Sequence, residues 1–189
     1  MKLNKFTVSF EGQDMYFLKK YGLFKAARMV KKHYKKHSTP FINDTYQLAN
    51  ELCLLHKDIF ELSKNARKHY KLIMLRKKNG GLRYIHSPDA PLKNAQRRIL
   101  KSILSNIKIS PYATAYVTGK NLKDNATPHI NHKYLLKMDI TDFFGSITYL
   151  QVISSAFNAN RFPVQIGAIL TSLCCLDDVL PQGAPTSPA

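Results

Sequence analysis

The chain has 189 residues, 44% of them hydrophobic, which is enough to bury one good core and argues for one domain with an elaborated end. Lysine and arginine number 29 against 12 acidic residues, a formal net charge of +17. So basic a surface indicates a polyanionic partner such as nucleic acid, and no apolar run behind Met1–Lys5 is long enough to predict a signal peptide or a membrane span.

The charge is unevenly distributed. The stretch from Asp139 to Ala189 holds one basic residue, Arg161, and four acidic ones, whereas positions 1–138 hold 28 basic and eight acidic residues. The net charges are therefore −3 and +20. A basic body beside a locally acidic segment is typical of a protein that grips phosphates and holds cations at one place. A lysine-rich solvated surface is the plainer alternative.

The first half of the chain predicts helices and then a hairpin. The apolar spacing favours helices over 14–36, from Asn43 or Asp44 onward, and over about 57–68. The lysine-rich run 31–37 could follow a phosphate backbone or be a solvated helix end. Two short strands, 69–76 and 82–86, flank Asn79-Gly80, the dipeptide most typical of a tight hairpin turn.

The predicted hairpin is basic, and so is one face of the helix expected after it. Arg76, Lys77, Lys78 and Arg83 could reach a polyanion from a glycine-hinged hairpin, or could merely keep an edge strand soluble. Leu92–Ile107 predicts a helix with an apolar stripe, and the residues placed on its polar face are Lys93, Gln96, Arg97, Arg98 and Lys101. That face could meet nucleic acid or plain solvent. His129 and His132 have no ligand partner at zinc spacing and predict no metal site.

The last third carries the candidate chemistry. Residues 134–140 favour a central strand that ends in Asp139, and an acid ending a buried strand is costly unless it is paired or binds metal. Two helices, 148–158 and 163–175, supply core. Asp177-Asp178 predicts a surface turn, and Leu180–Pro188 predicts a turn that starts a helix. The three cysteines, Cys53, Cys174 and Cys175, are expected to be reduced core thiols of a cytoplasmic protein.

Three segments in this order, Lys77–Pro88, Lys137–Ile147 and Leu180–Pro188, resemble the fingers hairpin and motifs A and B of reverse transcriptases. The resemblance is strongest to the bacterial retron type, with group II intron enzymes near by. It implies an α+β fold, namely part of a right-hand polymerase with an incomplete antiparallel palm sheet. The implied parts are a helical extension (1–40), fingers (41–133, hairpin 69–86) and a partial palm (134–189).

The resemblance also implies residue roles. Asp139 and the carbonyl of Ile140 would hold two Mg²⁺ ions, and Phe144 would be the steric gate that selects deoxynucleotides. Other implied contacts to the incoming nucleotide come from Arg76, Lys77, Lys78, Arg83, Asp142, Phe143, Gln182 and Gly183. Template contacts would come from Lys93, Arg97, Arg98 and Lys101. Core packing is the alternative for Phe143 or Phe144, and helix capping is the alternative for Asp142.

The chain also departs from the family pattern. It contains no Tyr-x-Asp-Asp motif, no thumb, and neither of the other carboxylates of the metal site. We therefore expect a fragment of an RNA-directed DNA polymerase that is inactive alone and could self-associate through its unfinished sheet. Expected partners of the whole protein are a structured RNA template, a primer and deoxynucleoside triphosphates, with antiphage defence as a possible role. The alternatives are a non-catalytic nucleic-acid-binding module, a group II intron enzyme or another defence-associated reverse transcriptase.

Overall fold

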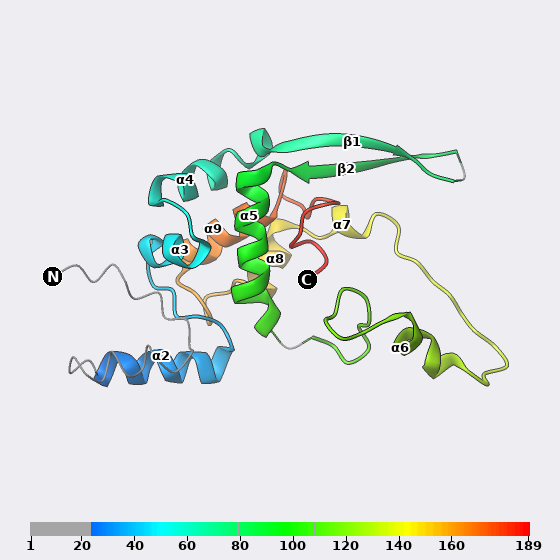
Figure 1. Cartoon of the computed structure of the whole chain (residues 1–189), viewed down its shortest axis with the longest axis horizontal. Coiled ribbons are helices and arrows are strands. Elements are labelled where there is room, and N and C mark those ends of the chain that lie inside the picture. Colours follow the sequence, from blue (N-terminus) through cyan, green and yellow to red (C-terminus); the bar gives the residue numbers. More distant parts are fainter. Residues whose placement is uncertain (1–23, 79, 108) are drawn as a thin grey trace.

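The computed structural model describes residues 24–78, 80–107 and 109–189. Within these ranges it is a mixed structure of short helices and one two-stranded antiparallel sheet (Figure 1). The helices and strands are α2 (Phe24–His37), α3 (Thr45–Leu52), α4 (His56–Lys64), β1 (Tyr70–Arg76), β2 (Leu82–Pro88), α5 (Ala90–Arg98), α6 (Leu122–Ala126), α7 (Phe143–Ser146), α8 (Tyr149–Ser155) and α9 (Val164–Cys174). The start of the helix expected over 14–36 lies outside the described residues.

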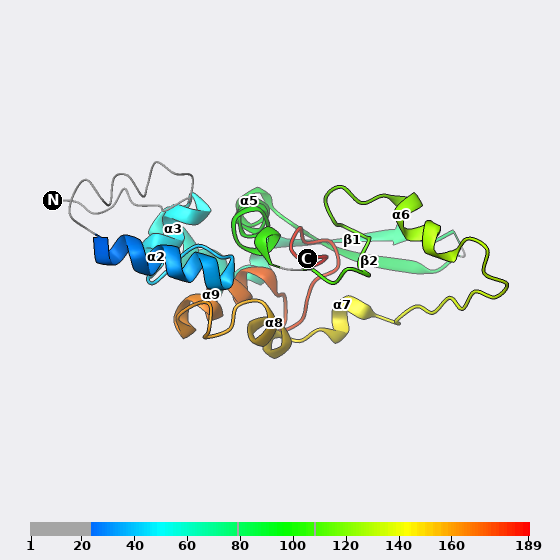
Figure 2. The same cartoon turned by 90° about the horizontal axis from the view of Figure 1, so that it is seen from below.

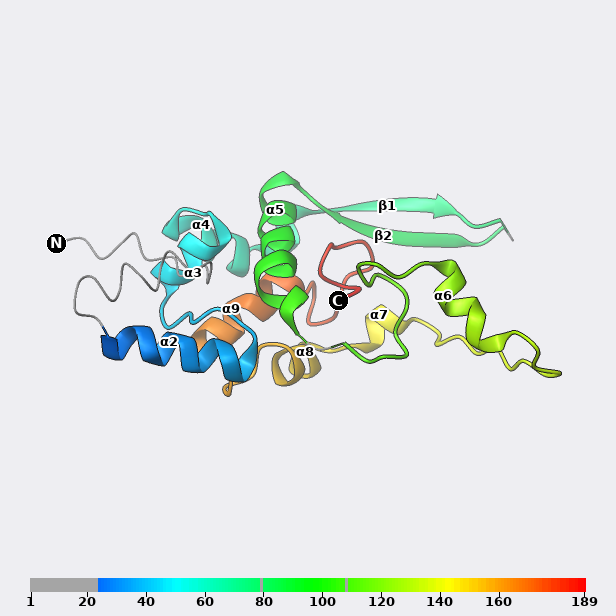
Figure 3. The ribbon, with the colours of Figure 1, turned by 60° about the horizontal axis from the view of Figure 1, so that its bottom comes forward.

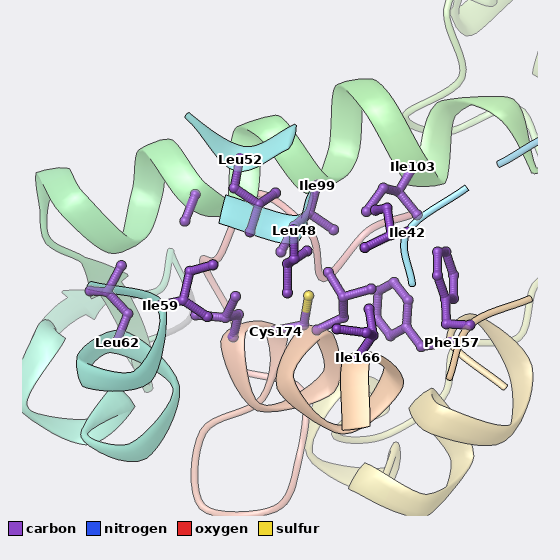
Figure 4. Close-up of a cluster of buried hydrophobic side chains, with 14 of the residues drawn as sticks. Ile42, Leu48, Leu52, Ile59, Leu62, Ile99, Ile103, Phe157, Ile166 and Cys174 are labelled. Atoms are coloured by element: carbon purple, nitrogen blue, oxygen red, sulfur yellow. The ribbon is translucent and has the colours of Figure 1, made fainter. Parts of the chain in front are cut away.

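The core is helical. Side chains from α3, α4 and α5 pack against α9 and α8, and Figure 4 shows Leu48 of α3, Ile99 just after α5 and Ile166 of α9 pointing toward one another. These side chains are at most 1% exposed. Burial of this apolar surface is the main force that holds the chain together.

Local signals set where several elements begin. The Asp44 side chain accepts a hydrogen bond from the Gln47 amide and caps α3, and Asp89 does the same for α5 through the Leu92 amide. Thr148 and Gln151 form a reciprocal capping box at α8. After α5 the helix widens into a π-turn at Ile99–Ile103, which keeps Ile99 and Ile103 on the core face.

The hairpin forms as predicted and projects from the body (Figures 1 and 2). Its register pairs Tyr70 with Pro88 and Arg76 with Leu82. The base is tied down, because the Asp89 amide donates to the His69 carbonyl at 2.8 Å and the His69 ring contacts the Asp89 carboxylate at 2.8 Å.

A long middle section contributes little to the core. Between Ile103 and Val152, no described residue is buried, although Leu104, Phe144 and Tyr149 pack partly against the core edge. Figures 1 and 3 show this section leaving the body after α5, passing through α6 and returning to α7.

The strand expected over 134–140 lies in this section, and that prediction is wrong. No described segment pairs with residues 134–140, and Leu135 and Met138 are 67% and 81% exposed. An extended segment becomes a strand only when a neighbour supplies the ladder of hydrogen bonds. The described sheet is therefore the hairpin alone, and the palm sheet expected from the resemblance does not form within the described residues.

Two further expectations need correction. Gln96, assigned to a polar face, is fully buried, and Cys53, assigned to the core, is an exposed residue that ends α3 in a left-handed conformation. Cys174 and Cys175 are buried and unpaired, as predicted. Burial raises the pKa of each of these two thiols to about 12. In the described part of the chain, no helix is both long and apolar enough to cross a membrane.

Candidate functional site

A groove of about 830 Å³ lies where three segments distant in sequence meet. The hairpin provides Lys77 and Arg83, the loop into α7 provides residues 139–145, and the turn before the chain's last residues provides 176–182. Eight of the residues nominated from sequence line it together: Lys77, Arg83, Asp139, Ile140, Asp142, Phe143, Phe144 and Gln182. The three segments that carry the family resemblance therefore converge on one surface feature.

The turn at 181–183 is docked directly on the hairpin. The His86 amide of β2 donates to the Gln182 carbonyl at 2.8 Å, so the outer edge of β2 is partly satisfied by this turn. Gly183 adopts φ +120°, and a Cβ there would lie 2.5 Å from Ile85 Cγ2 and 2.9 Å from the His86 carbonyl oxygen. Gly183 thus allows close backbone approach to β2, a packing reason that its expected role beside a base did not anticipate.

Side chains complete this contact across the groove. With its amide oxygen turned toward the hairpin, Gln182 accepts hydrogen bonds from Arg83 Nε at 2.9 Å and from a terminal Arg83 nitrogen. The guanidinium is thereby aimed along the wall instead of into open solvent. Two cations of the described groove are thus Arg83, which Gln182 holds in place, and the exposed Lys77 near the hairpin tip.

The acidic side of the groove, formed by Asp139 and Asp142, is held by fewer contacts than Arg83 is. Asp139 lies in the exposed segment before α7. Asp142 precedes α7 with φ 48°, a left-handed conformation, and its side chain makes no capping hydrogen bond. Its carboxylate lies against Gly145, where any Cβ would collide with it. Asp142 therefore occupies the cap position without acting as a side-chain cap.

The two phenylalanines separate into different environments. Phe144 packs against the edge of the core, whereas Phe143 is 45% exposed, and the two rings meet edge to face with centroids 5.5 Å apart. The expected core packing therefore applies to Phe144, which also lines the groove. Its ring is therefore supported on one side by the core.

Asp177 and Asp178 form a tight turn, as predicted. Both have positive φ, 48° and 63°, and Leu176 and Val179 exchange two backbone hydrogen bonds across them. This is a two-residue hairpin loop of the type that favours Asn-Gly. Asp177 pairs with Arg67 at 3.1 Å, with both side chains more than half exposed, so the pair contributes little to stability.

The donors for a divalent cation do not assemble. Among the described residues, no group of three histidine, cysteine or acidic side chains could hold a metal ion. Asp139 is exposed and Asp142 is turned onto Gly145, so the carboxylates present do not fit the two-cation centre that the resemblance implies. The metal role of Asp139 and Ile140 stays a prediction.

Several nominated residues lie outside the groove lining. Arg76 and Lys78 are exposed on the hairpin, and Gly183 supports the wall from behind. Of the cations in and just after α5, Arg97 and Lys101 line a second cavity of about 880 Å³, together with Ala113, residues 115–118 and Ala189. Lys93 and Arg98 line neither of these two cavities.

A buried polar cluster behind the hairpin was missed from the sequence. Gln96 Nε2 donates to the Tyr70 hydroxyl at 2.7 Å and to the Leu173 carbonyl at 2.8 Å. It thus joins the start of β1 to α5 and α9. Burial raises the pKa of Tyr70, and the hydrogen bond from Gln96 opposes that rise. Gln96 lies four residues after Leu92 and three before Ile99, on the apolar stripe, and this spacing was the available signal.

The chain resembles retron reverse transcriptases in direct comparison. It is 34% identical over 139 residues to the retron Mx65 reverse transcriptase of Myxococcus xanthus, covering 65% of this chain and 33% of that protein. It is 30% identical over 151 residues to the retron Ec86 reverse transcriptase of Escherichia coli, covering 79% and 47%. The retron Ec83 reverse transcriptase of Escherichia coli is 40% identical over 87 residues, covering 46% and 28%.

No protein-family model matches the chain. The chain spans less than half the length of each of these three relatives. Within that length the resemblance read from the three motifs is confirmed. The chain is therefore a member of the retron-type reverse transcriptases that corresponds to one part of their length.

Proposed function

We propose that this chain is the fingers and partial palm of an RNA-directed DNA polymerase, and that its groove receives the incoming deoxynucleoside triphosphate. The observation that carries the proposal is the convergence of Lys77 and Arg83, the 139–145 loop, and Gln182 on one groove. The hairpin cations suit the triphosphate, and Gln182, which Arg83 holds by its amide oxygen, keeps its amide nitrogen for the sugar or base. Phe144 lines the same groove, and its ring would exclude a ribose 2′-hydroxyl.

The whole protein would copy a structured RNA from a primer, with Mg²⁺, in the cytoplasm. A role in antiphage defence and the assignment of 41–133 to fingers and 134–189 to palm belong to the same proposal. Because the described carboxylates do not form a cation site, we expect no primer extension by these 189 residues alone. Extension of a primer on RNA by the isolated chain would contradict this expectation.

Calorimetric titration of dATP into the chain tests the groove directly. Arg83→Gln removes the fixed cation, and hydrogen bonds to charged groups contribute about 1.5–3 kcal/mol, so dATP should bind about 10–100-fold more weakly. Lys120→Gln is the matched control, because it removes an exposed charge from outside the groove lining. An equal loss of dATP affinity in the two variants would contradict the proposal that dATP binds in the groove.

The second candidate is a nucleic-acid-binding module without catalysis. The net charge of +17 and the lack of a described three-ligand cation site favour it. Asp139→Asn separates the two functions. If the groove serves a polymerase, primer–template binding survives the substitution and magnesium-dependent dATP binding falls. If neither binding changes, Asp139 is structural and the second candidate stands.

A further inference from the structure

Helix α2 carries a surface that the groove does not explain. Its 14 residues contain no acid, and its cations are all exposed: Lys25, Arg28, Lys31, Lys32, Lys35 and Lys36. At about 100° per residue, these six side chains fall within an arc of about 140° on one side of the helix. Lys25 and Lys36 are separated by about 16 Å along the axis. We call this arc the α2 basic face.

The opposite side of α2 packs against the segment that follows the helix. Val30 is 6% exposed and lies about 170° from the centre of the basic face. The His33 ring meets Phe41 edge to face with centroids 5.4 Å apart and contacts Thr39 Oγ1 at 3.4 Å. The basic face is therefore held outward by packing on its back.

The histidines of the inner side add little charge near neutral pH. The pKa of His33 is lowered by burial and then by His37 and Lys36. The pKa of His37 is lowered by burial and then by Lys36 and Arg161. The positive potential of α2 thus comes from the lysines and the arginine of its outer side.

We propose that the α2 basic face binds the phosphate backbone of a double-stranded nucleic acid. Six cations on one helix suit a row of phosphates, whereas proteins that bind unpaired strands stack bases on aromatic rings, and between Lys25 and Lys36 the arc carries none. A membrane surface is disfavoured, because an interfacial helix needs a broad apolar face toward the lipid. Among the described side chains of α2, Met29, 61% exposed, is the large apolar one beside the arc.

This surface is separate from the groove. Figures 1 and 2 place α2 at the end of the molecule away from the hairpin tip. A duplex bound to the α2 basic face would therefore leave the groove open. The proposal does not depend on the groove being a polymerase site.

Fluorescence anisotropy on the full chain tests the proposal, with a 20-base-pair RNA duplex, the same sequence as DNA duplex, and the single RNA strand as probes. The test variant is Arg28→Gln with Lys32→Gln and Lys36→Gln, which keeps good helix formers. The matched control is Lys57→Gln with Lys64→Gln and Lys120→Gln, which removes three exposed charges elsewhere. Arg28→Lys with Lys32→Arg and Lys36→Arg keeps the charge and should bind duplex as the unmodified chain does.

Counterion release sets the expected size of the effect. Losing three phosphate contacts should flatten the slope of log affinity against log salt by about 2–3 and weaken duplex binding at least about ten-fold. The control variant should change the slope by less than about 1. If both duplexes bind, the α2 basic face recognises the phosphates of either RNA or DNA. If only one binds, that duplex is the kind of nucleic acid that the surface recognises. Equal losses in test and control variants, or a loss confined to the single strand, would overturn the proposal.

Discussion

Gly183 offers the sharpest test of how the groove is built. Replacing it with alanine puts a Cβ at φ +120°, which costs about 1–2 kcal/mol in conformation alone. The new atom would also lie 2.9 Å from the His86 carbonyl oxygen, which belongs to backbone and cannot rotate away. The turn must then move off β2 and lose the 2.8 Å hydrogen bond from the His86 amide, worth about 1 kcal/mol.

Together these terms predict that Gly183→Ala lowers the free energy of unfolding by about 2–4 kcal/mol. Gly119→Ala is the control, since Gly119 has φ +80° but nothing lies within 4 Å of the position that its Cβ would take. It should cost only the conformational term, about 1–2 kcal/mol. Urea unfolding gives both values, and amide exchange of His86 reports whether the turn has left β2. Losses that agree within about 0.5 kcal/mol, with His86 still protected, would refute the close-approach argument.

The remaining predictions concern the core, the thiols and the acidic turn. Gln96→Ala should lower the free energy of unfolding by about 1–3 kcal/mol, because it removes the 2.7 Å hydrogen bond to the Tyr70 hydroxyl. A double-mutant cycle with Tyr70→Phe should show that the two losses are not additive, whereas additive losses would mean that this hydrogen bond contributes nothing. Cys53 should react with a disulfide reagent in the folded chain, and Cys174 and Cys175 only after unfolding. Folding raises the pKa of Cys174 and of Cys175 from 9.0 to about 12, so these thiols should not change the free energy of unfolding below pH 9 and should lower it as the pH rises from 9 toward 12. Urea midpoints measured across this pH range would show the decrease. Asp177→Asn with Asp178→Gly should raise stability by about 1 kcal/mol and leave dATP binding unchanged, whereas a loss of binding would give these acids a role in the site.

The parts of the fold that could be predicted are those with local causes. The hairpin follows from its turn dipeptide and α3 from its capping acid, and both causes lie within a few residues of their effect. The strand predicted over residues 134–140 does not form, because a strand needs a hydrogen-bonding partner from a distant part of the chain and apolar content alone does not supply one. Gln96 was predicted to be exposed because it is polar, although its position on the apolar stripe of the helix indicates burial.

The groove shows the same division. Its wall residues could be nominated because each lies in a recognisable short string, and the structure brings eight of them together. The contacts between the strings could not be read in advance. That Arg83 reaches Gln182, and that Gly183 meets Ile85, depends on how the helical core orients the hairpin base over the 181–183 turn.

The exposed section between Ile103 and Val152 has a consequence for assembly of the chain. The core is formed by residues before it, such as Leu48 and Ile99, and after it, such as Leu170, while no described residue within it is buried. A protease cut near Leu136 should therefore leave the two pieces bound to each other. Separately expressed halves divided there should recombine into a folded complex, much as a split reporter protein does.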